Sequence, residues 1–136
     1  MNALNKRKKM VSLTFRGFDM PAAQVIELVG LKSSRFGNKG EHVKPGVRAL
    51  LARSYVVFSL EFSEDFDMCE MIPEFISHIG GLDHVLKVQG AVKPEFTEFN
   101  LDLPVMSSDD VQDGYLSKET ISDVFYLQST VSFSYF

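Results

Sequence analysis

The sequence has little cysteine: its 136 residues include a single one, Cys69, and no tryptophan. One thiol excludes an internal disulfide and a multi-cysteine zinc site. A chain of this length typically buries about two-thirds of the surface of its unfolded form, so it needs neither a disulfide nor a metal ion to fold. Because an unpaired thiol is easier to keep in a reducing compartment, we expect a cytoplasmic protein.

Long apolar runs are also missing. No window approaches the ~18 apolar residues of a transmembrane helix, so we expect no membrane association. The basic run at 6–9 is followed by Ser12, Thr14 and Arg16, which do not form the apolar core of a secretory signal. We therefore expect residues 1–8 to be a flexible basic tail and 9–136 to form a single domain.

Positive charge is in the minority. The chain has 14 Lys and Arg against 18 Asp and Glu, a net charge of −4. This balance argues against nucleic acid as a partner, because a basic face must replace the counterions along the phosphates. It is compatible with a basic protein partner. Phenylalanine is abundant instead, with 12 residues, and we expect most of these rings in the core.

Alternation of apolar and polar residues predicts four strands, at about 9–17, 55–62, 96–104 and 130–136. Residues 31–50 are rich in glycine and basic residues and are predicted to form a loop. Residues 106–114 are predicted to form a second, acidic loop. Residues 82–88 fit either a short helix or an extended segment.

Three helices are predicted between these strands. The first, at about 20–29, has Asp19 as a candidate N-cap and Gly30 as its stop. The second begins near Ser63 and runs to residue 79, and Pro73 inside it predicts a kink or a late start. The third is capped by Ser117, and its predicted buried stripe consists of Ile121, Val124, Phe125 and Leu127.

The predicted order of elements is strand, helix, strand, helix, strand, helix, strand. This order predicts an α+β fold in which two β-α-β units flank a central helix. The caps Asp19 and Ser117 occupy matching places in the two units. A four-stranded sheet with its helices on one face is the economical way to bury these apolar stripes. We therefore expect a variant of the ferredoxin-like fold.

Three segments of the chain resemble those of the bacterial domain-of-unknown-function family numbered 4279. They are Gly17-x-Asp19-x-Pro21, Val25-Ile26-x-x-x-Gly30-Leu31 and Lys39-Gly40-Glu41. The resemblance extends to the helix and aromatic strand of 117–136. It departs from the family at Glu41, in the absence of tryptophan, and at 105–116, which looks like an inserted loop. The family has no established activity. The resemblance implies a bacterial protein, and a candidate immunity protein encoded near toxin genes.

No set of residues predicts a metal, a cofactor or an enzyme. Asp109, Asp110 and Asp113 resemble the start of a calcium loop, but Val111 and Thr120 stand where ligands belong. Cys69 and His78 are too far apart on one helix to share a zinc ion. Cys69 is expected to be a small buried apolar residue. A general base at His42 or His78 has no evident carboxylate beside it.

Two kinds of binding site are predicted. The first is a set of acidic residues that are candidates for contact with a basic protein. The set consists of Asp109, Asp110, Asp113, Glu64, Asp65 and Asp67, with Glu61 and Glu70. Alternatively, the glycine-rich loop containing Arg35 and Lys39 could hold an anion. We accordingly expect a small protein-binding domain, most concretely an immunity-type inhibitor of a toxin or effector. A small-ligand or anion-binding module is the alternative, and an enzyme is the third.

Overall fold

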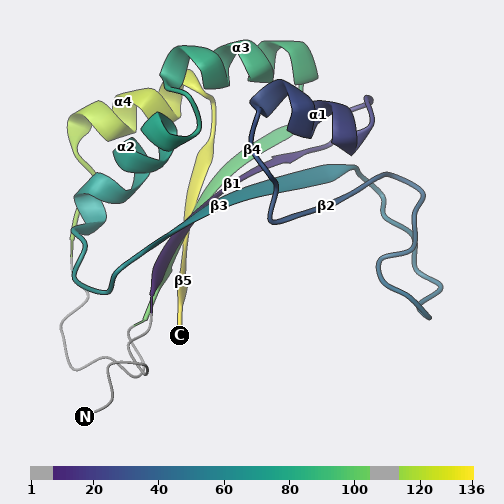
Figure 1. Ribbon diagram of the computed structural model, residues 1–136, viewed down its shortest axis with the longest axis horizontal. Coiled ribbons are helices and arrows are strands. Elements are labelled where there is room, and N and C mark those ends of the chain that lie inside the picture. The colour runs from purple at the N-terminus through teal and green to yellow at the C-terminus, as the bar shows by residue number, and fades with distance from the viewer. Residues whose placement is uncertain (1–7, 105–113) are drawn as a thin grey trace.

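The computed structural model describes residues 8–104 and 114–136, which form a five-stranded sheet and four helices (Figure 1). The sheet has the order β2-β3-β1-β4-β5, and the helices lie over one face. The α+β class is thereby confirmed. In chain order the elements are β1 (Lys9–Arg16), α1 (Ala22–Val29), β2 (Arg35–Gly37), β3 (Tyr55–Phe62), α2 (Met68–His78), α3 (Leu82–Val92), β4 (Phe96–Leu103), α4 (Lys118–Tyr126) and β5 (Thr130–Tyr135).

Strand β1 is the centre of the core. It pairs antiparallel with β3 and with β4, so that Leu13 lies between Phe58 and Phe99. All three side chains are buried. Successive residues of a strand point to opposite faces, so the same register places the polar residues of these strands on the face that the helices leave open. The predicted period of two is confirmed for these strands.

The sheet has one strand more than expected. β2 lies within the segment predicted to be a loop, and it pairs antiparallel with the first half of β3. Three residues are too few to show a periodicity, which is why the sequence does not reveal this strand. The prediction of a four-stranded sheet is therefore wrong.

Only one half of the chain is a β-α-β unit. β4 and β5 are parallel and α4 connects them, as predicted. β1 and β3 are antiparallel, so α1 does not connect two parallel strands of a β-α-β unit. The expected ferredoxin-like arrangement of two such units is not found in the described residues. The direction of β3 follows from the chain 30–54, which includes β2 and returns β3 alongside β1.

The second predicted helix starts late, and a separate helix follows it. α2 begins at Met68 and still contains Pro73, whose missing N–H leaves the carbonyl of Cys69 without its intrahelical donor. Gly80 and Gly81 then separate α2 from α3, which covers the segment that the sequence left open between helix and extended chain. None of the helices in the described part of the chain is long and apolar enough to cross a membrane.

The two predicted N-caps have different outcomes. The Ser117 hydroxyl accepts a hydrogen bond from the Thr120 N–H at 3.1 Å, as expected. Asp19 caps nothing, because α1 begins one residue after Pro21, whose side chain has no capping oxygen. Instead the Asn38 side-chain oxygen accepts from the Ala22 N–H at 2.8 Å. The cap of α1 therefore comes from the residue after β2, which the sequence could not indicate.

Replacement of Asn38 by Ala should destabilise the protein by about 1 kcal/mol, a typical loss for a helix cap. Asn38→Asp, which keeps an acceptor oxygen, should retain most of this stability. Asp19→Ala is the matched control and should change the free energy of unfolding by less than about 0.5 kcal/mol. Urea denaturation of the variants measures these differences. An equal loss of unfolding free energy in Asn38→Ala and Asp19→Ala would contradict the assignment of Asn38 as the cap of α1.

Candidate functional site

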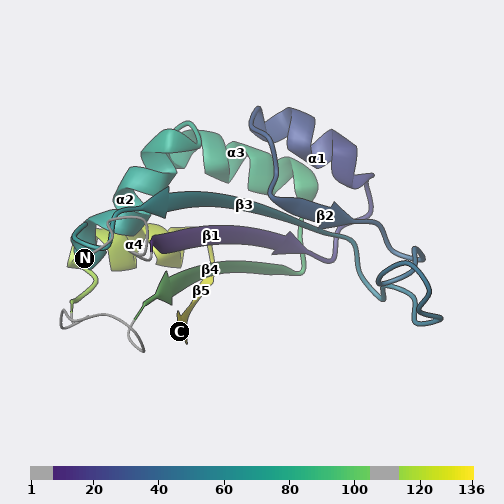
Figure 2. The same ribbon diagram turned by 60° about the horizontal axis from the view of Figure 1, so that its bottom comes forward.

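The open face of the sheet is a polar groove. In the view of Figure 2, β2, β3, β1, β4 and β5 follow one another across it with the helices behind. Its hydroxyl groups bond to one another: Ser59 lies 3.0 Å from Ser12 and 3.1 Å from Ser34. On β5, Ser132 donates to the Asn100 side-chain oxygen at 2.7 Å. The groove is lined by Met10, Ser12, Thr14, Arg16, Ser34, Arg35, Val57, Ser59, Glu61, Glu98, Asn100, Asp102, Ser132 and Ser134.

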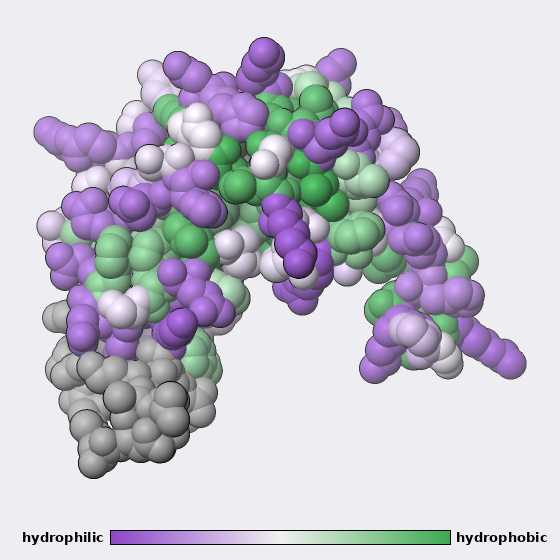
Figure 3. All heavy atoms as spheres, viewed as in Figure 1, coloured by the Kyte–Doolittle hydropathy of each residue, from purple (hydrophilic) through white to green (hydrophobic). Residues whose placement is uncertain are grey.

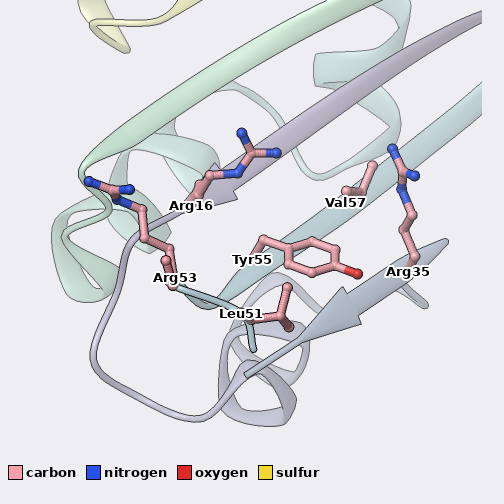
Figure 4. A pocket seen from close by; sticks show the side chains of 7 residues that line it. Arg16, Arg35, Leu51, Arg53, Tyr55 and Val57 are labelled. Atoms are coloured by element: carbon pink, nitrogen blue, oxygen red, sulfur yellow. The ribbon is translucent and has the colours of Figure 1, made fainter. Parts of the chain in front are cut away.

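Arginines gather at one end of this groove. Arg16 on β1 is paired with Tyr55 on β3, and Arg35 on β2 is paired with Val57 of the same strand. Residues paired across a sheet share a face, so the two arginines flank Tyr55 and Val57 from opposite sides. Figure 4 shows the Arg16 and Arg35 side chains on either side of the Tyr55 ring, whose hydroxyl points toward Arg35.

The segment that leads into β3 closes the pocket at this end. Leu51, Ala52 and Arg53 complete the lining, and the volume is about 340 Å³. The chain between β2 and β3 projects away from the sheet, and the molecule is hollowed beside it (Figures 1 and 3). The pocket thus has an apolar floor of Leu51, Tyr55 and Val57 with guanidinium groups around it.

Two of the three arginines already have carboxylate partners. Arg53 Nε lies 3.1 Å from Glu95, and its guanidinium stacks over Phe96 with 5.4 Å to the ring centroid. The Arg53 guanidinium therefore points away from Tyr55 (Figure 4). Arg16 lies 3.6 Å from Glu98 in a pair whose side chains are 47% and 37% exposed. Exposed pairs of this kind contribute about 0–1 kcal/mol, so an incoming anion competes with them on nearly equal terms.

Arg35 supplies the uncompensated charge of the pocket. Its guanidinium forms no ion pair or hydrogen bond with any residue in 8–104 or 114–136. β1 and β2 are separated by β3 alone, so their backbones run roughly 10 Å apart, twice the spacing of neighbouring strands. A guanidinium group binds carboxylate or phosphate through two parallel hydrogen bonds. The geometry suits a ligand with one or two such groups lying over Tyr55.

One residue of this pocket, Arg35, was among the anion-binding candidates named from the sequence. Arg35 lines it, whereas Lys39, its predicted partner, does not. Lys39 lies in the turn after β2, where its backbone N–H donates to the Ser54 hydroxyl at 2.8 Å. Arg16 and Arg53 were missed. The period of two places Arg16 on the open face, but only the strand pairing shows that Arg35 lies on the same face, on the other side of β3.

The acidic residues predicted to contact a partner are only partly described. Asp109, Asp110 and Asp113 lie outside the described residues. Glu64, Asp65 and Asp67 lie in the turn between β3 and α2, at the opposite end of β3 from the arginines. Glu61 at the end of β3 pairs with Lys8 at 3.5 Å. A protein partner for this acidic segment stays a prediction.

Cys69 is not fully buried as expected. It lies in the first turn of α2 and is half-buried. Together with Asp67, Met68, Gly114 and Tyr115 it lines a second hollow. A side-chain hydrogen bond with Cys69 and the negative charges nearby raise the pKa of Tyr115 above its usual value.

The histidines stand apart from any carboxylate cluster. His42 Nδ1 lies 2.8 Å from the carbonyl oxygen of Val47 in its own loop, and His78 is exposed on α2. His84 Nε2 lies 2.9 Å from the carbonyl oxygen of Val29 and ties α3 to the end of α1. Among the described residues no group of three His, Cys, Asp or Glu side chains could hold a metal ion.

No family model, curated protein or solved structure matches this chain at a significant level. The resemblance to family 4279 therefore stays a prediction, and the functional argument rests on the geometry of the pocket.

Proposed function

We propose that this protein is a binding module for a small anionic ligand, held at the arginine end of its open sheet face. The observation that carries the proposal is the position of Arg35, an exposed cation without a described partner beside an apolar floor. Arg16 lies on the other side of the same floor. The ligand class is a carboxylate or phosphate compound, because a guanidinium fork matches these groups.

The proposal is consistent with the negative charge of the whole chain. The net charge of −4 would repel a polyanion such as nucleic acid over its length, whereas a small anion meets only the local field of the pocket. The pocket of about 340 Å³ is at the small end of the range for ligand sites, roughly 300–1,000 Å³. A compound of the size of citrate or a nucleoside phosphate suits it.

The test is calorimetric titration of the protein with inorganic phosphate, pyrophosphate, citrate and a nucleoside diphosphate. We expect at least one of them to bind with a dissociation constant of ~1 mM or below, equivalent to about −4 kcal/mol. Arg35→Ala should weaken that binding at least tenfold, or by about 1.4 kcal/mol. Binding should also weaken at high salt, since the site is open to solvent.

Lys39→Ala is the matched control, because it removes one positive charge a few residues from Arg35 but outside the pocket. It should bind the anion as the unaltered protein does. Equal losses in Arg35→Ala and Lys39→Ala would indicate general charge attraction and contradict the site. If none of the four compounds binds at ~10 mM, well above the expected dissociation constant, the proposed function fails.

A further inference from the structure

The β5 edge of the sheet carries an apolar surface that no described residue covers. Five large side chains of α4 and β5 are exposed there, although both elements contribute to the core. We call these residues the β5 edge surface: Ile121 55%, Phe125 76%, Tyr126 63%, Phe133 41% and Tyr135 60% exposed. Exposed apolar surface of this extent on one edge indicates a binding surface.

The exposure of these residues departs from the sequence prediction. Of the predicted buried stripe, Val124 and Leu127 are buried, together with Thr120, whereas Ile121 and Phe125 are exposed. On β5, Phe133 and Tyr135 share a face with Val131, which packs against the core. The helix layer thus covers only the first part of this strand.

β5 is also an edge strand without protection. It is last in the strand order, and none of the six residues Thr130–Tyr135 is charged or a proline. Proteins normally protect such an edge from pairing with other strands by means of lysine, proline, a bulge or a very short strand. The opposite edge illustrates this, because β2 has three residues and one of them is Arg35. No strand among the described residues pairs with the outer side of β5, so its N–H and C=O groups there can pair with a strand of another chain.

We propose that the β5 edge surface binds a second copy of this chain, through antiparallel pairing of the two β5 strands about a twofold axis. In such a pair the same surface meets itself, so it must be compatible with its own copy. A strand without charge meets this condition, since like charges directly opposite one another are destabilising. A pair centred on Phe133 places its ring beside Phe133 of the second copy, and Val131 beside Tyr135 of the second copy.

The exposed area is sufficient for a dimer of ordinary size. If a large aromatic side chain offers about 200 Å², the exposed parts of these five side chains amount to roughly 600 Å² per copy. A standard interface takes about 800 Å² from each partner. The outer backbone of β5 and the polar residues around it supply the difference. A short peptide strand would leave the aromatic face of α4 uncovered, which favours a second copy.

The test is the molar mass of the protein in solution, measured by light scattering at ~100 μM, well above the ~1 μM constant of a moderate interface. We expect a mass of twice 15.3 kDa. Phe133→Lys and, separately, Phe125→Lys should shift the mass to that of the monomer. Both side chains are exposed, so each variant should fold, which its circular dichroism spectrum should confirm.

Phe36→Lys is the matched control, because Phe36 is 52% exposed on the other edge strand. It should leave the dimer intact. Amide hydrogen exchange supplies a second measurement: exchange of the β5 amides should accelerate on dilution, while that of β1 should not. A monomeric mass for the unaltered protein, or a dimer that survives both α4 and β5 substitutions, overturns the proposal.

Discussion

Phe99→Ala should lower the free energy of unfolding by about 3–5 kcal/mol, the usual range for truncation of a buried phenylalanine. Phe99 lies on β4 opposite Leu13 of the central strand, and its ring meets Phe75 of α2 edge to face with 6.4 Å between centroids. It therefore joins the sheet to the helix layer. Removing the ring leaves a cavity between the two layers that the surrounding strands cannot close.

Phe96→Ala is the control on the same strand. Phe96 is 48% exposed and lies on the open face, where Arg53 stacks over it. Its loss should reduce stability by no more than about 1 kcal/mol, the scale of an exposed cation–π contact. Urea denaturation of the two variants measures the difference. Similar losses would show that the core does not lie where the register of β1 and β4 places it.

Gly17→Ala should be the most damaging small substitution, with a loss of about 2–4 kcal/mol from backbone strain and crowding together. Gly17 directly follows β1 with φ at +81°, and its N–H donates to the Ser54 carbonyl at 2.8 Å. A Cβ atom there would lie 2.8 Å from the Cβ of Glu95. That atom is close to the backbone and cannot move aside, so the chain after β1 must shift.

Gly30→Ala separates the two contributions. Gly30 has a similar φ of +86° as the C-cap of α1, but a Cβ atom there would meet nothing within 4 Å. The Gly30→Ala variant should therefore lose only the part of the folding stability that comes from backbone strain, about 1–2 kcal/mol. If the two substitutions lower the stability measured by thermal unfolding equally, the close approach of Gly17 and Glu95 is not present in solution.

The Gly17 contact bears on the proposed anion site as well as on stability. Gly17 follows Arg16, and the Glu95 backbone N–H donates to the Gly17 carbonyl at 3.1 Å. Glu95 in turn holds Arg53. Two arginines of the pocket are thus positioned through one backbone turn at the end of β1. This explains why residues far apart in the sequence reach one end of the groove.

Local patterns in the sequence determined much of the fold. The alternation along 9–17, 55–62 and 96–104 placed Leu13, Phe58 and Phe99 on the buried face, because each strand shows its own period of two. Gly30 and Ser117 were recognised as helix ends, since the residues at a cap are contiguous in the chain. The α+β class follows from these elements alone.

What depends on contacts between distant segments was decided only by the tertiary structure. Asn38 caps α1 from beyond β2, and Arg16 and Arg35 flank β3 on the same face of the sheet because β2 folds back as a fifth strand. The rotation of α4 leaves Phe125 exposed, although its spacing resembles that of a buried stripe. Sequence periodicity records which residues share a face. The packing of neighbouring elements determines whether that face is covered, and the strand order determines which side chains meet on it.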